Sequence, residues 1–319
     1  MFVLTSIIDR LYEVLALVQE GLGMVPHDVP LIRRVQKQMR LAPRCLQVEQ
    51  ADSDSFSSIS FVEVDKKNKR VPVLSADERN LVIRPNIDVV RHIRTLGRGG
   101  NGSVDLVYFK GHTRVMKTLL RGVNIRGLLK EIRIQRDLAG AGGAPEIHGL
   151  SLVPAKVIMT YTGQTYDQYI KECTQQEAVR TLMLVAQKLD EIHEKGYAHN
   201  DLKVNNITVG VSKNVDIHII DYGLSTRLGK VLWPSGKRRV RRCWYAPELY
   251  AGKPATRASD VYSFGDVIAN VSKRVYNREI SGALTVLQKF AMKERPADRP
   301  TLSALIKQLE VIVEAVDVM

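Results

Sequence analysis

The amino-acid sequence predicts an α+β fold in two lobes, with an antiparallel, β-rich N-lobe and a helical C-lobe. Strand-like segments dominate residues 89–161, and helical periodicities dominate the residues that follow. Strands that come first and helices that come later distinguish an α+β chain from an alternating parallel sheet. The length of 319 residues fits one large domain or two smaller ones. A cleft between the lobes is then the natural ligand site.

The first 88 residues are expected to precede the packed domain. Residues 1–48 are predicted to be a helical N-terminal extension, because apolar side chains from Leu4 to Val18 recur at helical spacing and a second short helix fits Leu31–Leu41. Residues 49–88 are predicted to be a linker with short strands, since EQADSDSFSSIS is polar and SFVEV and RVPVL alternate. The helical stripe fits packing within the chain or a partner site, and packing is the commoner use of such a stripe.

Residues 89–316 are predicted to form the packed domain, with the N-lobe at about 89–159 and the C-lobe at about 163–316. The expected strands are VVRHIRTL, VDLVYF, TRVMKTL and AKVIMTY. Two helices are expected from apolar residues that share one face. The first is Glu177–Lys195, with Leu182, Val185, Leu189 and Ile192; the second is Leu302–Val313, with Leu302, Leu305, Ile306, Leu309 and Ile312.

Composition and charge narrow the class of protein. Hydrophobic residues make up 45% and charged residues 25%, which is the ordinary globular balance. No charge-free apolar run reaches the ~18 residues of a membrane-spanning helix. The three cysteines are far apart, so we expect neither a disulfide framework nor a zinc site, and we expect an intracellular location, cytoplasmic or nuclear. The net charge of +13 favours anionic partners, and the basic runs Arg33–Arg44, Lys66–Arg70 and Lys237–Arg242 fit solvated faces or nucleic-acid patches.

A glycine-rich segment, LGRGGNGSV, is the first candidate site. Gly97, Gly99 and Gly102 follow a strand signal, and glycines at this spacing let backbone N–H groups approach phosphate oxygens. A glycine-rich hairpin without a ligand explains this segment equally well. Lys117 ends the apolar segment RVMKTL, and a lysine that points inward from a strand needs an anion. Glu131 in the following helical stretch is the candidate partner, unless both side chains lie on the surface.

The strongest block is YAHNDLKVNNITV, followed by IIDYGLS. Asp201, Asn206 and Asp221 offer hard oxygen ligands on two turns, a composition suited to Mg²⁺. Lys203 adds a positive charge two residues after Asp201. A carboxylate that orients a hydroxyl, metal ligands and a lysine together suit phosphoryl transfer.

The chain resembles the eukaryotic-type protein kinase family over about residues 89 to 316. The resemblance rests on eight motifs in family order, which chance does not explain. They are GRGGNGSV, Lys117, Glu131, HNDLKVNN, DYG, the APE motif Ala246–Glu248, SDVYSFGD at Ser259–Asp266, and RPADRP with Arg299 and Pro300.

The resemblance implies a site for ATP and Mg²⁺ and a protein substrate. Asp201 would accept the hydroxyl proton and Lys203 would steady the γ-phosphate. Asn206 and Asp221 would hold Mg²⁺. Lys117, placed by Glu131, would contact the α- and β-phosphates, which the glycine loop covers. The adenine would be enclosed by Leu96, Val104 and Val115, with Met159 at the back and Thr160–Thr162 as the hinge. Glu248 with Arg299, and Asp260, would be architectural.

Lysine two residues after the catalytic aspartate is the serine/threonine-type signature of the family, which implies hydroxyl specificity for Ser and Thr. The main alternative is a pseudokinase that binds a protein partner without transfer. A small-molecule phosphotransferase shares part of the catalytic loop, but the APE motif, SDVYSFGD and the closing arginine favour a protein substrate. A nucleic-acid-binding module rests on the basic runs alone, and the sequence leaves the oligomeric state open.

Five features of the sequence depart from the family pattern. Asn200 replaces an arginine that pairs with a phosphorylated loop residue in relatives, so we expect activity without activation-loop phosphorylation. Residues 221–248 hold seven Lys/Arg against two acids, with Arg241 at the place of a P+1-loop threonine, which suggests acidic substrates. Gln135 is polar where an apolar spine residue is usual, and Val115 replaces an alanine. Only 34 residues separate Gly265 from Arg299, which implies a reduced substrate-docking helix.

Overall fold

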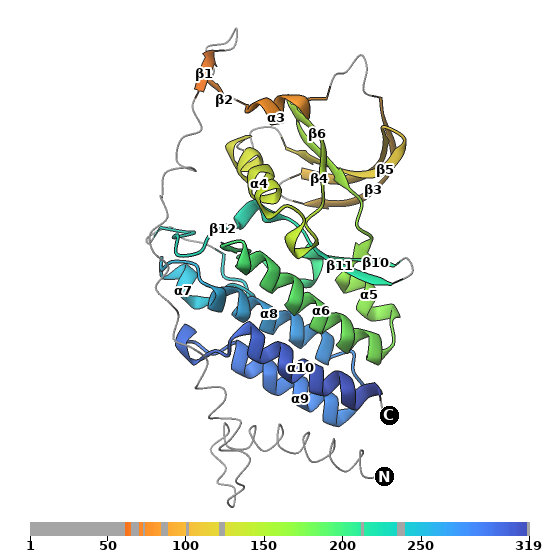
Figure 1. Cartoon of the computed structure of the whole chain (residues 1–319), viewed down its shortest axis with the longest axis vertical. Helices are drawn as coiled ribbons and strands as arrows, with labels where there is room; N and C mark the ends of the chain where they lie inside the picture. Colours follow the sequence, from red (N-terminus) through yellow and green to blue (C-terminus); the bar gives the residue numbers. More distant parts are fainter. Residues whose placement is uncertain are drawn as a thin grey trace, which may run out of the picture. The chain divides into compact units, whose positions relative to one another are not determined.

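The computed structural model describes residues 61–64, 70–72, 74–83, 89–99, 102–120, 125–211, 214–234 and 240–317 (Figure 1). These residues form two compact units. The N-terminal unit holds the described residues up to Gly140 together with Ala144–Thr162, and the C-terminal unit holds Ala141–Gly143 and the described residues from Gly163 onward. The helices expected over Leu4–Val18 and Leu31–Leu41 lie outside the described residues.

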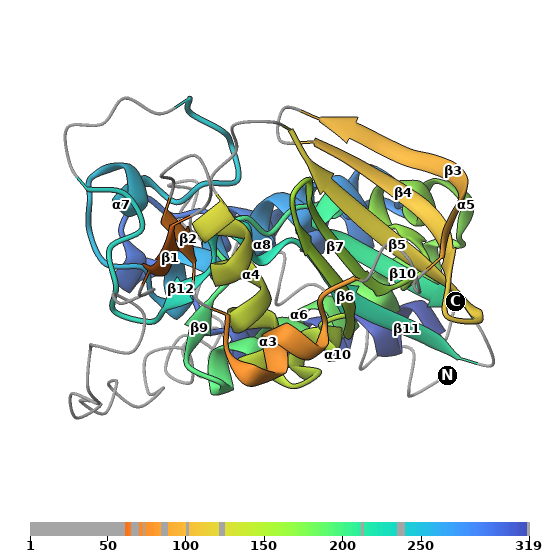
Figure 2. The same ribbon diagram turned by 90° about the horizontal axis from the view of Figure 1, so that it is seen from above.

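The N-terminal unit is built on a five-stranded antiparallel sheet in the order β3-β4-β5-β7-β6 (Figure 2). Four of its strands are those that the sequence predicts, and β6 is an additional strand at one edge. The alternating pattern places Val107, Phe109, Met116 and Ile158 in one buried cluster. The strands are β3 (Val90–Gly99), β4 (Gly102–Phe109), β5 (His112–Leu119), β6 (Ile147–Leu152) and β7 (Ala155–Thr160).

Helix α4 (Ile125–Leu138) covers the other face of this sheet. Its buried residues Leu128, Leu129 and Ile132 pack with Leu150 of β6 and Val157 of β7. The spacing of these apolar residues makes one helical stripe, so burial against the sheet holds α4 in place.

Residues 74–83 form ordered structure where the sequence analysis expected a linker. Helix α3 (Ala76–Asn80) is followed by a single parallel bridge between Val82 and Leu150 of β6. Ser75 and Glu78 form a capping box on α3, a pattern visible in SADE, but short polar helices are easily taken for linker. The alternating segments SFVEV and RVPVL contain the antiparallel pair β1 (Phe61–Val64) and β2 (Arg70–Pro72).

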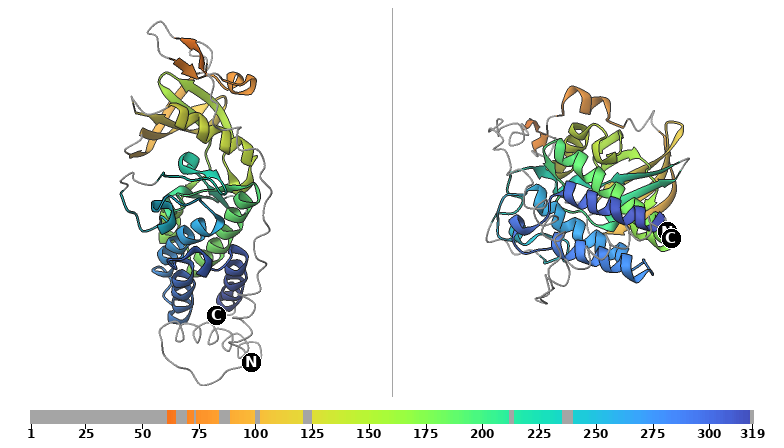
Figure 3. Two further views of the ribbon diagram at one scale, coloured as in Figure 1. Left: turned by 90° about the vertical axis from the view of Figure 1, so that its left-hand side faces the viewer. Right: turned by 60° about the horizontal axis from the view of Figure 1, so that its bottom comes forward.

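The C-terminal unit is mainly helical (Figure 3). Helix α6 (Gln175–Glu194) packs against α10 (Leu302–Asp317) and α8 (Arg257–Ser272), and α8 packs on α9 (Arg278–Ala291). The two helices expected from apolar periodicity are both present. Helix α6 begins two residues before the expected start because Thr174 caps it: Thr174 Oγ1 accepts from the Glu177 amide at 3.2 Å, and Glu177 Oε2 accepts from the Thr174 amide at 2.8 Å.

Helix α9 follows α8 after residues 273–277, and no other described helix lies between them. The sequence analysis expected a reduced substrate-docking helix because only 34 residues separate Gly265 from Arg299. The five residues between α8 and α9 are too few to hold a further helix of several turns. Asn277 starts α9 by accepting hydrogen bonds from the amides of Glu279 and Ile280 at 2.9 and 3.1 Å. No helix among the described residues is long and apolar enough to span a membrane.

Short elements of the C-terminal unit carry its polar loops. Strands β10 (Ile207–Val211) and β11 (Val215–Ile219) form a hairpin, and β8 (Gln164–Thr165) pairs with the other edge of β10. Strand β9 (Tyr197–Ala198) pairs with β12 (Thr226–Arg227). The remaining elements are η1 (Ala141–Gly143), α5 (Tyr166–Glu172), η2 (Val204–Asn206), η3 (Tyr222–Leu224), α7 (Pro247–Tyr250) and η4 (Pro296–Asp298).

Candidate active site

The N-terminal unit brings Lys117 and Glu131 together. Lys117 Nζ donates to Glu131 Oε1 at 2.7 Å and to Oε2 at 3.0 Å, which joins β5 to α4. The two side chains are 18% and 9% exposed, so this is a largely desolvated ion pair rather than a surface contact. A largely buried ammonium oriented by the Glu131 carboxylate is suited to hold further anionic groups.

The candidate adenine residues share a face with this lysine. In the sheet, Val104 pairs with Lys117, and Val115 pairs with Leu106 and with Met159. Because directly paired residues and residues two apart on a strand share a face, Val104, Val115, Met159 and Lys117 project to the side on which α4 packs. The face therefore combines an apolar surface with one fixed cation.

The glycine segment forms the hairpin between β3 and β4. Gly97 pairs with Val104 and Gly99 pairs with Gly102, while Leu96 lies at a register shift in β3 and is 36% exposed. Gly102 has φ +152°, and a Cβ there would overlap the Thr118 carbonyl oxygen of β5. Only glycine meets this requirement, whereas Gly97 and Gly99 have open space around them.

Gln135, the polar residue at a position that is usually apolar in the family pattern, is buried at 6% exposure. Its amide Nε2 donates to the Pro145 carbonyl oxygen, so the donor is paired inside the unit. The polar side chain thus anchors the end of α4 to the segment before β6. Pairing offsets the cost of burying the amide group.

The catalytic-loop block HNDLKVNN gathers three donors around Asp201, which is 6% exposed. Lys203 Nζ donates to Asp201 Oδ2 at 2.7 Å, and Asn206 Nδ2 donates to the same oxygen at 2.9 Å and to the Asp201 carbonyl at 2.8 Å. Trp244 Nε1 donates to Asp201 Oδ1 at 2.8 Å. Three charge-assisted bonds hold this carboxylate in one orientation.

Trp244 is a site residue that the sequence analysis did not select. Its ring also lies under the Lys203 ammonium, at 5.1 Å from Nζ to the ring centroid. Asp201 also affects the neighbouring Tyr245. The pKa of the Tyr245 hydroxyl is raised mainly by burial and further by the negative charge of Asp201. Trp244 stands two residues before the APE motif, but no pattern in the sequence links it to Asp201, which is 43 residues away.

Asn206 and Asp221 lie at the same end of one hairpin. Asn206 precedes β10, Asp221 follows β11 by two residues, and Ile207 pairs with Ile219. The Ile220 amide donates to the Asn206 carbonyl at 2.9 Å, which closes this end. Asp221 adopts a left-handed conformation with φ +66°. Both hydrogens of the Asn206 amide go to Asp201, so its Oδ1 is not used in these bonds.

This donor set fits Mg²⁺. The described residues contain no cluster of three or more His, Cys, Asp or Glu side chains that would suit a zinc-type centre. One amide oxygen and one carboxylate at the same end of the β10–β11 hairpin match the few protein oxygens that Mg²⁺ takes beside phosphate groups. Asn206 and Asp221 could therefore hold the ion.

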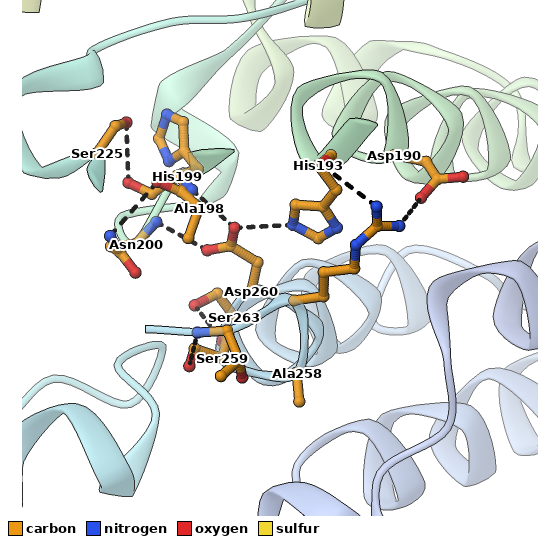
Figure 4. Close-up of polar contacts among 12 residues, drawn as sticks. Asp190, His193, Ala198, His199, Asn200, Ser225, Ala258, Ser259, Asp260 and Ser263 are labelled. Atoms are coloured by element: carbon orange, nitrogen blue, oxygen red, sulfur yellow. Dashed lines mark hydrogen bonds and ion pairs between the residues drawn. The ribbon is translucent and has the colours of Figure 1, made fainter. Parts of the chain in front are cut away.

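Asp260 anchors the loop that carries Asp201 (Figure 4). This fully buried carboxylate accepts from the His199 and Asn200 amides at 2.7 Å each and contacts His193 Nε2 at 3.0 Å. Burial alone would raise the pKa of Asp260, but the hydrogen bond and charge of His193 outweigh it and the pKa is lowered. The residue thus stays ionised and fixes two consecutive backbone amides, which is the architectural role expected of it.

Asn200 connects the catalytic loop to the segment after DYG. Its Nδ2 donates to the Leu224 carbonyl at 3.1 Å and to Thr226 Oγ1 at 3.0 Å. Ser225 Oγ donates to the His199 carbonyl at 3.1 Å, and Thr226 pairs with Ala198 in the β9–β12 ladder. Neutral groups therefore hold the start of this segment.

Aromatic packing holds the later part of the same segment. Trp233 is 7% exposed and lies edge to face on Tyr245, with ring centroids 5.0 Å apart, and 5.5 Å from Tyr250. Arg241 and Arg242 are exposed and lie near the rings of Tyr250 and Trp244, each at 5.9 Å. Lys237–Arg239 lie outside the described residues.

Glu248 and Arg299 form a buried ion pair. Arg299 Nη1 and Nη2 donate to Glu248 Oε1 and Oε2 at 2.7 and 2.8 Å, and Ser259 Oγ donates to Oε1 at 2.9 Å. The other three N–H groups of the guanidinium donate to backbone carbonyls, of Lys293 at 2.8 Å, Ala258 at 2.8 Å and Glu294 at 2.9 Å. The pair ties α7 to the chain before α10.

A family model described as protein kinase domain matches residues 90–309. A probable serine/threonine-protein kinase of Dictyostelium discoideum is 32% identical over 126 residues, covering 36% of this chain and 13% of that protein. The serine/threonine/tyrosine-protein kinase HT1 of Arabidopsis thaliana is 29% identical over 135 residues, covering 41% and 34%. Another probable serine/threonine-protein kinase of Dictyostelium discoideum is 24% identical over 299 residues, covering 80% and 18%. The chain thus spans between 13% and 34% of the length of these relatives.

Proposed function

Because the chain belongs to the protein kinase family, we propose that it transfers the γ-phosphate of ATP to Ser and Thr hydroxyls of protein substrates. The observation that carries this proposal is the Asp201 carboxylate, which is buried and held by Lys203, Asn206 and Trp244. A fixed carboxylate within reach of a hydroxyl is the group that this reaction requires. ATP as the donor places the activity inside the cell.

Each candidate residue receives one role in this proposal. Asp201 accepts the proton of the attacking hydroxyl, and Lys203 neutralises charge on the transferring group. Asn206 and Asp221 hold Mg²⁺, which supplies charge neutralisation for the phosphates when bound.

The N-terminal unit supplies the groups that bind ATP. Lys117, oriented by Glu131, contacts the α- and β-phosphates, and backbone N–H groups of the hairpin at Gly97, Gly99 and Gly102 cover them. The apolar face of Val104, Val115 and Met159, together with Leu96 of the glycine hairpin, takes the adenine.

The Ser/Thr assignment rests on Lys203 two residues after Asp201, and on relatives whose names say serine/threonine-protein kinase. The Lys203 side chain is 25% exposed and is bonded to Asp201, which supports a role for its ammonium beside the transferring phosphoryl group.

Transfer of radiolabelled phosphate from ATP to generic basic and acidic protein substrates tests the proposal. We expect Mg²⁺-dependent label on Ser or Thr with the wild-type chain and none with Asp201→Ala. Absence of transfer by wild-type chain that binds ATP would favour a binding scaffold instead.

We expect activity that does not depend on activation-loop phosphorylation. Asn200 holds Leu224 and Thr226 through a neutral amide, and Trp233 packs the later segment, so no phosphate is needed to order these residues. Phosphatase-treated protein should keep its transfer rate within about twofold. Asn200→Ala should lower the transfer rate. It leaves the Leu224 carbonyl and the Thr226 hydroxyl without this donor, which costs about 1–3 kcal/mol of the free energy that holds the start of the segment in place. Loss of activity on phosphatase treatment alone would contradict this prediction.

We further propose a preference for acidic substrates. Arg242 is exposed beside the ring of Trp244, and Trp244 donates to Asp201, so one cation lies near the catalytic carboxylate. The adjacent Arg241 is exposed beside the ring of Tyr250 and adds a second positive charge to the same stretch of chain. Opposite charge on a substrate lowers its KM and makes that KM sensitive to salt.

Matched peptides with Asp or Lys around the acceptor serine test this preference. We expect the acidic peptide to have a KM about tenfold lower, and the advantage to disappear in Arg241→Gln/Arg242→Gln. The control Lys273→Gln/Arg274→Gln removes the same charge from the exposed connection after α8 and should keep the preference. Equal KM values for both peptides would remove this proposal.

A further inference from the structure

Residues 74–83, which we call the α3 segment, precede the family match at residues 90–309 but pack inside the N-terminal unit. Leu74 and Leu81 lie on the apolar cluster that contains Leu128, Leu129 and Ile132 of α4. The Leu81 carbonyl accepts from the Leu150 amide at 2.7 Å, and the Ile83 amide donates to the Leu150 carbonyl at 2.8 Å. The segment therefore bridges α4 and the edge strand β6.

Glu78 is the central polar residue of this segment, because its side chain is only 1% exposed. Arg133 of α4 donates through Nε to Glu78 Oε1 at 2.6 Å and through Nη2 to Oε2 at 3.0 Å. The Ser75 amide donates to the same Oε2 at 2.7 Å. A carboxylate buried to this extent without partners would be strongly destabilising, so the ion pair with Arg133 holds α3 against α4.

The protonation behaviour of Glu78 agrees with this geometry. Burial alone would raise the pKa of this carboxyl, but hydrogen bonds from Arg133 and Ser75 outweigh burial and lower the pKa. The Glu78 hydrogen bond in turn raises the pKa of Arg133. The pair is thus ionised near neutral pH.

Arg133 and Glu131 face opposite ways on α4. They are two residues apart, which is about 200° around a helix. Glu131 is bonded to Lys117 of β5, and Arg133 is bonded to Glu78 of α3. Arg136, three residues after Arg133, adds an exposed bond to Asp77 at 2.8 Å. Ionic contacts therefore hold α4 from two sides.

We propose that the α3 segment is a positioning element of the catalytic unit, in which Glu78 holds α4 where Glu131 can pair with Lys117. The functional unit accordingly begins at or before Leu74. This inference rests on the proposed function, since the Lys117–Glu131 pair matters to the reaction through its contact with ATP. A five-residue helix is too short to be stable by itself, so tertiary contacts must hold it there.

The test uses Glu78→Gln in the full chain, with Asp77→Asn as the matched control, because Asp77 is 71% exposed and bonds the same helix through Arg136. Two measurements need no nucleotide: amide hydrogen exchange of α4, and the rate at which an amine-acylating reagent labels Lys117. We expect Glu78→Gln to raise both at least fivefold and Asp77→Asn to change neither by more than twofold. Unchanged exchange and labelling in Glu78→Gln would overturn the inference.

A double-mutant cycle with Glu131→Gln distinguishes positioning from general stability. Glu78→Gln should weaken Mg²⁺-ATP binding about tenfold in the wild-type background and have almost no effect once Glu131 is already replaced. An equal loss in both backgrounds would mean that Glu78 does not act through Glu131. If wild-type chain binds no ATP, the proposed function fails, but exchange and labelling still decide this inference.

Arg133→Lys is the second variant, in case Glu78→Gln does not fold. Lysine keeps the charge but loses the two-pronged geometry of the guanidinium. We expect a smaller rise in α4 exchange and Lys117 labelling in the same direction. Wild-type values for both in folded Arg133→Lys would also count against the positioning role.

Discussion

Replacing Asp201 by asparagine is expected to lower the rate of phosphoryl transfer by about 10²- to 10⁴-fold, because the hydroxyl loses its proton acceptor. Lys203 and Asn206 both donate to Oδ2, which an amide oxygen can replace. The new NH₂ group then faces the Trp244 N–H, which cannot accept a hydrogen bond. The affinity for ATP should change little, since Asp201 binds no phosphate in this proposal. Steady-state kinetics together with ATP titration measure both quantities.

The control for this variant is Asp216→Asn. Asp216 lies on β11 of the same unit and its side chain is 62% exposed. Its replacement by asparagine is therefore the same chemical change made away from the catalytic loop. We expect its transfer rate to match the wild type. A rate for Asp201→Asn within tenfold of the wild type would show that this carboxylate is not the proton acceptor.

Replacing Arg299 by methionine is expected to cost about 3–5 kcal/mol of the free energy of unfolding, the usual penalty for breaking a buried ion pair. All five N–H groups of the guanidinium are used, and the side chain is fully buried. Its loss leaves the buried Glu248 carboxylate without a counter-ion, with the Ser259 hydroxyl still donating to it, and leaves three backbone carbonyls without the arginine N–H groups. Chemical denaturation followed by circular dichroism measures the change.

Lys171→Met is the matched control for Arg299→Met. Lys171 bonds Asp167 at 2.6 Å one turn away on α5, but the two side chains are 45% and 35% exposed. Exposed pairs of this kind contribute about 0.3–0.5 kcal/mol. A similar small loss in Arg299→Met would mean that the Glu248–Arg299 pair is not an important support of the unit.

The sequence predicted the larger elements of the fold because their periodicity follows burial directly. Helix α6 has Leu182, Val185 and Leu189 fully buried on one face, which is the pattern that predicts it. Strand β6 was missed because Gly149 and a register shift after Ile147 interrupt the alternation in a strand of six residues. A short edge strand next to a glycine-rich stretch carries too little signal.

The part of the candidate site whose residues lie close together in the sequence was predictable from their spacing. The aspartate, lysine and asparagine of HNDLKVNN lie within six residues, and the structure joins all three by hydrogen bonds. Trp244 and Glu78 were missed because their partners, Asp201 and Arg133, are 43 and 55 residues away. Contacts at such separations depend on tertiary packing, which periodicity does not report.

Calorimetric titration of the full chain with ATP, with and without Mg²⁺, tests most directly whether the residues of HNDLKVNN and DYG contribute to a site that binds Mg²⁺ and ATP. We predict binding that Mg²⁺ strengthens at least tenfold, that Asp221→Asn makes insensitive to Mg²⁺, and that Lys117→Met weakens in either case. No heat of binding under both conditions, from chain whose α6 and α10 are folded, would contradict the account.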